Sequence, residues 1–134
     1  MKWTTFEVKD VLFGLVNVAS VKGVISGNIY LDFRPTDSDK EDVVINSLPI
    51  SHTSWQQCTA NVNIYVKDLK AKLNGGTQDV PNRARLEVIT KAVIDAVEGK
   101  GGEDWVCNVV SDHVFKNDDG SHMSNVRIAF RKLN

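Results

Sequence analysis

The sequence predicts an α+β domain in which two helices pack on one face of a mainly antiparallel sheet of about five strands. Two observations carry this prediction. Apolar residues recur at three- and four-residue spacing in two segments, and they alternate with polar residues in five others. The resulting order α-β-β-β-α-β-β is typical of helices gathered on one face of a sheet.

The first element is a helix that begins after Thr4. Thr4 as N-cap and Glu7 three residues later form a capping signature, because each side chain can satisfy a backbone N–H group at the start of the helix. The apolar residues of this segment form one stripe along the helix: Val8, Val11, Leu12 and Leu15. Glycines at positions 23 and 27 end the region.

Three strands are predicted next, at 28–34, 42–48 and about 55–67. In the first, Ile29, Leu31 and Phe33 are expected to point inward. The connection PTDSDKE after it is a polar loop, since proline cannot join a strand ladder. The third strand is the longest, and its even positions from Cys58 to Val66 are apolar.

The second half holds a helix at 82–98 and two strands at 105–115 and 122–133. Pro81 suits the first turn of the helix, and a group of glycines stops it. The segment 70–80, with its Asn-Gly-Gly stretch, is expected to be a flexible excursion. Asp119-Gly120 predicts a hairpin turn between the last two strands. The apolar positions expected to share one core are Val62, Ile64, Leu86, Ile89, Val93, Val126 and Ile128.

Chain length and net charge limit the classes of protein to which this sequence can belong. A chain of 134 residues is expected to form one domain, residues 1–134, with a single core. Sixteen basic residues against seventeen acidic ones give no basic field, which disfavours nucleic acid as the main ligand. No secretory or membrane-spanning apolar run is recognised, so we expect folding in a reducing cytoplasm and no membrane partner.

Searches for catalytic and metal-binding patterns predict no catalytic residue, no metal site and no cofactor. His113 and His122 could face each other across the terminal hairpin beside Asp112, but two solvated histidines are the simpler interpretation. The acidic loops do not fit the twelve-residue calcium loop. Cys58 and Cys107 lie in apolar strands, where a reactive thiolate is disfavoured. The three tryptophans fit core edges or interfaces.

The longest strand carries neutral polar residues where charged residues would be usual. Thr59, Asn61 and Asn63 alternate with its apolar positions, and Asn has a low preference for strands. Such a row of side chains is either a solvated sheet face, a contact surface for another subunit, or the lining of a passage for DNA. We expect Thr59, Asn61 and Asn63, together with Arg127 and Arg131 of the last strand, to form an interface.

The order of elements resembles a known family. The strand ending NIYLDFRP, the strand TANVNIYVKD, the helix ARLEVITKAVIDAV and the closing hairpin DDGSHMSNVRIAFRK follow an N-terminal helix. From about Thr5 to Lys132 this order and its hydrophobic pattern resemble small tail-completion proteins of tailed phages and prophages, the tail terminator and head-to-tail joining group.

This resemblance implies a structural α+β subunit, not an enzyme, that assembles as a ring, commonly of six copies. Its partners would be copies of itself and other tail or head-connector proteins, with DNA only as passing cargo. The subunit would be cytoplasmic during assembly and then part of the virion. A non-enzymatic bacterial binding or adaptor domain and a small enzyme remain the alternatives. The loops at 35–41 and 70–80 are expected to be mobile in the isolated subunit.

Overall fold

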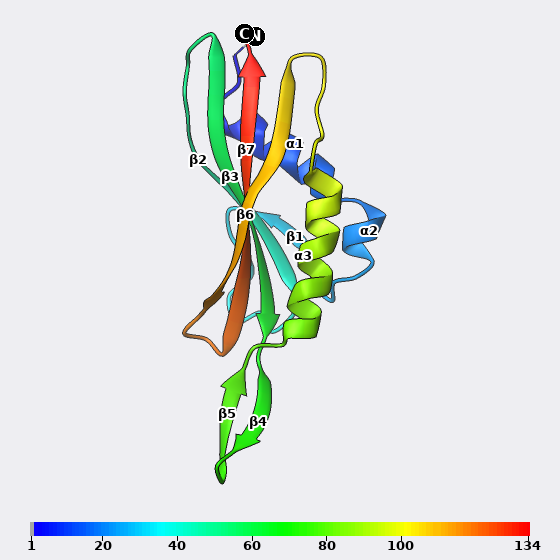
Figure 1. Cartoon of the computed structure of the whole chain (residues 1–134), viewed down its shortest axis with the longest axis vertical. Helices are drawn as coiled ribbons and strands as arrows, with labels where there is room; N and C mark the ends of the chain where they lie inside the picture. Colours follow the sequence, from blue (N-terminus) through cyan, green and yellow to red (C-terminus); the bar gives the residue numbers. More distant parts are fainter. Residues whose placement is uncertain (1) are drawn as a thin grey trace.

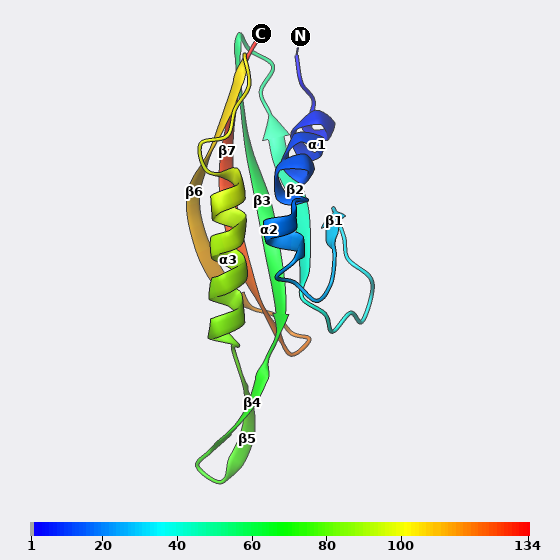
Figure 2. The same ribbon diagram turned by 90° about the vertical axis from the view of Figure 1, so that its right-hand side faces the viewer.

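The chain folds into a twisted five-stranded sheet with helices on one face and a separate hairpin projecting from one end (Figures 1 and 2). The computed structural model describes residues 2–134. The helices are α1 (Thr5–Val16), α2 (Ala19–Lys22) and α3 (Arg83–Val97). The strands are β1 (Ile29–Leu31), β2 (Asp42–Ile50), β3 (Trp55–Lys67), β4 (Leu69–Leu73), β5 (Gly76–Val80), β6 (Trp105–Lys116) and β7 (Ser121–Leu133).

The strand order in the main sheet is β1-β2-β3-β7-β6, and β4 pairs only with β5. β1 runs parallel to β2, and every other pair is antiparallel. The two longest strands, β3 and β7, lie at the centre and pair without interruption from Trp55 opposite Leu133 to Lys67 opposite Ser121. The prediction of a mainly antiparallel α+β fold is therefore confirmed in its broad form.

Local signals explain where the long helices begin. The capping box at Thr4 and Glu7 forms as predicted, with the Glu7 carboxylate accepting from the Thr4 N–H at 2.8 Å. At α3, the Asn82 side chain accepts from the Arg85 N–H at 3.4 Å. Both caps satisfy N–H groups that the first turn of a helix leaves free.

The predicted core is confirmed. All seven apolar residues named from the pattern lie in one buried cluster, and the side chains of Val62, Ile89 and Ile128 are fully buried. On the inner face of the sheet, α1 packs its apolar stripe mainly against β2 and also against β3, and α3 packs its own against β3 and β7 (Figure 2). Within residues 2–134, no helix covers the opposite, outer face of the sheet.

The first strand is shorter than predicted, and the helix count is higher. β1 ends at Leu31 because Asp32 adopts a left-handed backbone with φ of 70°, which turns the chain out of the sheet. Phe33, expected to point inward, is 74% exposed. A third, short helix, α2, follows α1 directly, so the prediction of two helices was wrong in this detail.

The segment predicted as a flexible excursion is an ordered hairpin. β4 and β5 pair from Leu69 opposite Val80 to Leu73 opposite Gly76. Asn74 and Gly75 form the turn with φ of 50° and 79°, values that suit the tight two-residue connections of antiparallel strands. The hairpin extends beyond the end of the main sheet (Figures 1 and 2). Among the described residues, no helix is long and apolar enough to cross a lipid bilayer.

A candidate interaction face on the sheet

The outer face of the sheet brings together all five residues singled out from the sequence. Strand alternation places the side chains of Thr59, Asn61 and Asn63 on this face of β3, and those of Arg127 and Arg131 on the same face of β7. Asn61 lies directly opposite Arg127. Their role as an interface stays a prediction, but their placement on one surface follows from the register of the two central strands.

The amide side chains form a hydrogen-bonded network across three strands. Asn61 Nδ2 donates to Asn46 Oδ1 on β2 at 2.9 Å. Asn125 Nδ2 on β7 donates to Asn61 Oδ1 at 3.1 Å and to Asn63 Oδ1 at 2.7 Å. Asn61 and Asn63 are each only 8% exposed. The amides therefore bond to one another along the sheet.

This network corrects one expectation and adds two residues. The neutral residues of β3 lie on the outer face as predicted, but Asn61 and Asn63 are covered by their neighbours. Sequence reasoning missed Asn46 and Asn125, which belong to other strands. The antiparallel register of β3 and β7, with Asn63 opposite Asn125, is the signal that connects them.

The two arginines differ in their surroundings. Arg131 lies over the Trp55 ring, with its guanidinium carbon 5.1 Å from the ring centre, which is within the range of cation–π attraction. Arg127 is exposed and makes no ion pair within residues 2–134. It offers five N–H donors to an acceptor outside the chain.

A hollow adjoins this face at the ends of β2 and β3. The β2–β3 register shifts between Ser47 and Ile50, and the displaced strand exposes Leu48 to 44%. The hollow has a volume of about 880 Å³ and is lined by Leu48, Pro49, Gln57, Thr59, Ala129 and Arg131, among others. Exposed apolar side chains beside a network of satisfied amides are suited to contact with another protein surface.

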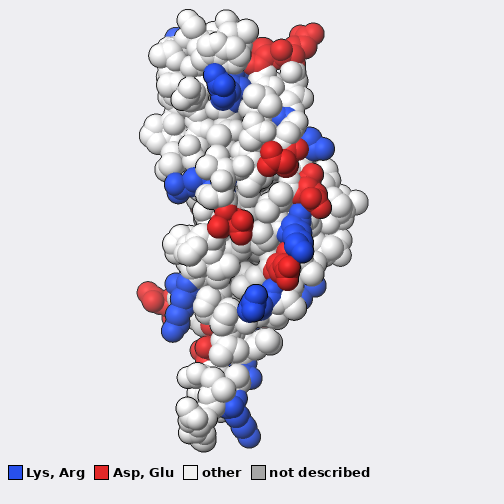
Figure 3. All heavy atoms as spheres, viewed as in Figure 1, with Lys and Arg blue, Asp and Glu red and all other residues white. Residues whose placement is uncertain are grey.

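Charged side chains are concentrated elsewhere. In the space-filling view they follow α3 in a line, whereas the upper part of this view over β2, β3 and β7 is mostly white (Figure 3). Arg127 and Arg131 are the charged side chains of the five residues singled out on this face, and no acidic residue is among them.

The acidic loops are fastened by one arginine. Arg34 binds Asp42 Oδ2 at 3.4 Å and Asp119 Oδ2 at 3.3 Å, and it lies 4.2 Å from the centre of the Tyr65 ring. Asp42 is 1% exposed and also accepts a hydrogen bond from the Ser38 hydroxyl. The Ser121 hydroxyl, and then Arg34, lower the pKa of Asp119. These contacts tie the predicted mobile loop 35–41 to the β6–β7 turn.

The histidines of the terminal hairpin do not meet. His113 lies opposite Asn125 and packs edge-on against Phe115, with ring centres 4.7 Å apart. His122 Nδ1 lies 2.5 Å from Asp68 Oδ1 instead. Within the part of the chain that the structure describes, no three His, Cys, Asp or Glu side chains are grouped to hold a metal ion.

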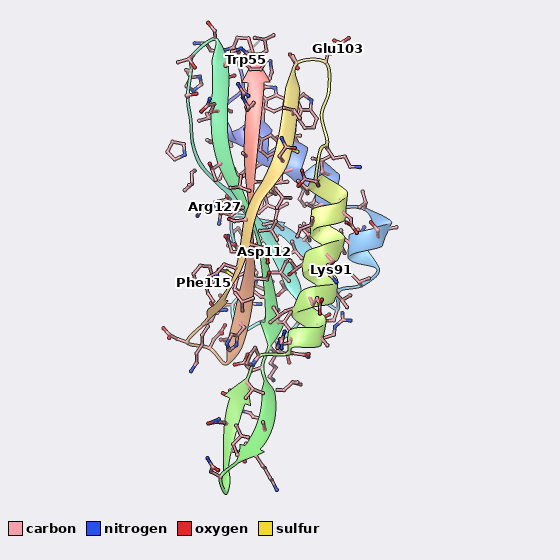
Figure 4. The ribbon with its side chains drawn as sticks, viewed as in Figure 1. Trp55, Lys91, Glu103, Asp112, Phe115 and Arg127 are labelled. Atoms are coloured by element: carbon pink, nitrogen blue, oxygen red, sulfur yellow. The ribbon has the colours of Figure 1, made fainter. Side chains whose placement is uncertain are left out.

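The cysteines and tryptophans are mainly structural. Cys58 and Cys107 are free and buried, and burial raises the pKa of both thiols, that of Cys107 to about 11. Trp105 packs between Trp3 and Phe130 at the edge of the core, with ring centres 5.7 and 6.2 Å away. Trp55, by contrast, is 47% exposed beside the candidate face (Figure 4).

Comparison with known proteins finds similarity at the level of the fold. No family model matches the sequence, and no curated protein matches it. The structure is similar to a chain in the solved virion of a native gene transfer agent particle, with a TM-score of 0.51 and 11% sequence identity. The alignment covers 98% of this chain and 92% of that chain. The two proteins therefore share an α+β fold over nearly their whole lengths.

Proposed function

We propose that the protein is a structural subunit of a phage-like particle, and that it acts as a tail terminator or head–tail connector by assembling into a ring. The observation that carries the proposal is the fold similarity to a chain of a gene transfer agent virion over nearly the full length of both chains. The same role is implied by the resemblance of the element order to tail-completion proteins.

The outer face supports a role in assembly. Its four bonded amides leave few unsatisfied polar groups, so covering them costs little desolvation free energy. Leu48 and Trp55 on its margin remain exposed, and Arg127 can form parallel hydrogen bonds with a carboxylate of a neighbour. A ring requires such a patch to meet a different patch on the next copy.

Light scattering across a range of concentrations tests the proposal. The native chain should form a single closed oligomer, for which six copies is the expected number. Arg127→Glu should reduce the size of this oligomer. Because Arg127 is on the surface, the thermal midpoint of the variant should stay within about 2 °C of the native value. Lys22→Glu on the exposed surface of α2 is the control and should assemble normally. A chain that stays monomeric at every concentration would instead favour the binding or adaptor domain.

A further inference from the structure

The free edge of β6 is covered over its first half. β6 pairs with β7 on one side only. On its other side, the Cys107 N–H donates to the Lys100 carbonyl at 2.9 Å, and the Val109 N–H donates to Glu98 Oε2 at 3.0 Å. The chain that leaves α3 thus satisfies the backbone of the β6 edge as far as Val109.

The second half of this edge is open. A bulge at Val110 shifts the register between Val109 and Ser111. Beyond the bulge, the alternation of an antiparallel pair directs the N–H and C=O groups of Asp112, Val114 and Lys116 to the free edge. No backbone or side-chain partner from residues 2–134 covers them. An open edge with exposed apolar side chains is a template for pairing with another strand.

An apolar groove runs beside the open edge, between β6 and α3. It has a volume of about 550 Å³ and is lined by Pro81, Leu86, Thr90, Ile94, Asp112 and Val114, among others. Figure 4 places Asp112 on β6 and Lys91 on α3 at the two sides of this groove. Val114 is 42% exposed. A strand added to the edge would lay one of its faces over the groove.

The projecting hairpin has the matching features. Its pairing register puts Leu69, Ala71, Leu73 and Val80 on one, mainly apolar face with Gln78, and Lys70, Lys72, Thr77 and Asp79 on the other. Leu69 and Leu73 are 50% and 49% exposed, so about half of each of these side chains remains open to solvent. A two-stranded hairpin alone in water is at best marginally stable. This hairpin needs a surface on which to bury its apolar side chains.

We propose that the β4–β5 hairpin of one copy docks on the open edge of β6 in a second copy. One hairpin strand pairs with the Val110–Lys116 edge, and Leu69 and Leu73 enter the groove between β6 and α3. The lengths agree, since each hairpin strand has five residues and the open edge has seven. Addition of a strand to a sheet edge is a common mode of recognition, in which backbone hydrogen bonds supply affinity and alternate side chains supply specificity.

The docked hairpin keeps its own charges out of the groove. With Leu69 and Leu73 in the groove, Lys70, Lys72 and Asp79 lie on the opposite face of the hairpin. Lys70 and Asp79 pair with each other on that face. The contact therefore buries no charged side chain of the hairpin.

The hairpin is set to reach a neighbour. It extends along the long axis, away from the main sheet of its own chain (Figures 1 and 2). Its root is fixed, because the Asp68 N–H donates to the Gly120 carbonyl at 3.0 Å and the Asp68 carboxylate contacts His122. Because the hairpin and the β6 edge are different patches, each copy can donate one and accept the other. The inference rests on the proposed ring for closure of this head-to-tail contact.

Cross-linking of two variants tests the docking. One copy carries Leu73→Cys in the hairpin, and the other carries Val114→Cys on the open edge. The native thiols are buried with raised pKa values, so they react slowly under mild oxidation. An equal mixture should give the mixed disulfide dimer at least tenfold faster than a control mixture of Phe6→Cys with Val114→Cys, since Phe6 is 70% exposed on α1.

A second pair of variants measures assembly. Leu69→Lys combined with Leu73→Lys should reduce the oligomer to monomers, and its thermal midpoint should match that of the native chain at a concentration where both are monomeric. Thr77→Lys on the polar face of the hairpin should assemble normally. If the native oligomer persists in the double variant and the mixed dimer forms no faster than the control, the docking is wrong and the ring stands. If the mixed dimer forms but only open chains are found, the docking stands and the ring is wrong. A native chain that is monomeric, with no excess of mixed dimer, contradicts both.

Discussion

The amide network of the outer face should be a measurable source of stability. Asn125→Ala removes the two hydrogen bonds that its Nδ2 donates to Asn61 and Asn63. Each is worth about 1 kcal/mol, so the free energy of unfolding should fall by about 2 kcal/mol. With about 2.1 cal/mol/K of unfolding entropy per residue, a chain of this length should melt roughly 7 °C lower.

Urea unfolding followed by tryptophan fluorescence, at a concentration where the chain is monomeric, measures this loss. A double-mutant cycle of Asn63→Ala and Asn125→Ala should give a coupling energy of about 1 kcal/mol, because the two side chains are 2.7 Å apart. Gln57→Ala is the control, since Gln57 is exposed on the same face of β3 and its side chain makes no hydrogen bond in residues 2–134. A coupling energy near zero, or a loss no greater than that of the control, would refute the network as a stabilising feature.

Three further predictions concern the core, pH dependence and the loops. Ile128→Asp should cost more than about 4 kcal/mol, because it places an unpaired charge in the fully buried core, while Ile128→Val should cost about 1 kcal/mol; equal unfolding midpoints would contradict the core assignment. Arg85 lowers the pKa of Glu41 from 4.5, so their contact stabilises the fold fully above pH 4.5 and is lost as the pH falls below it. Glu41→Gln should therefore lose less stability than the native chain on acidification, and an identical pH profile would count against the ion pair. Limited proteolysis should cut the β4–β5 hairpin before the loop 35–41, because Arg34 and Asp42 hold that loop in place. Cleavage of the loop before the hairpin would contradict this order.

Much of the fold could be predicted because its signals are local. The Thr4–Glu7 capping box, the alternation in β3 and the Asp119-Gly120 turn are each encoded within a few residues, and the structure contains all three. The β4–β5 hairpin was also locally encoded, since Asn74-Gly75 is a strong turn signal. The prediction of a flexible excursion was wrong because each flanking strand has only five residues, and GTQDV is mostly polar.

The features that escaped prediction depend on which strands become neighbours. Asn46, Asn61, Asn63 and Asn125 come from three strands, and only the register of the folded sheet makes them one network. The parallel pairing of β1 with β2 and the half-covered edge of β6 are likewise results of tertiary arrangement. Phe33 was misplaced because one left-handed residue, Asp32, ends the strand before the alternation does.

The position of the protein in assembled particles decides whether it completes the tail of a phage-like particle. Particles should be purified from a strain that carries the gene and from a matched deletion strain, and compared by electron microscopy with a labelled copy of the protein. We expect the labelled chain at the junction of head and tail, and we expect particles from the deletion strain to have unjoined heads and tails or tails of irregular length. Complete, normally joined particles from the deletion strain, with no labelled chain in particles that carry the gene, would contradict it.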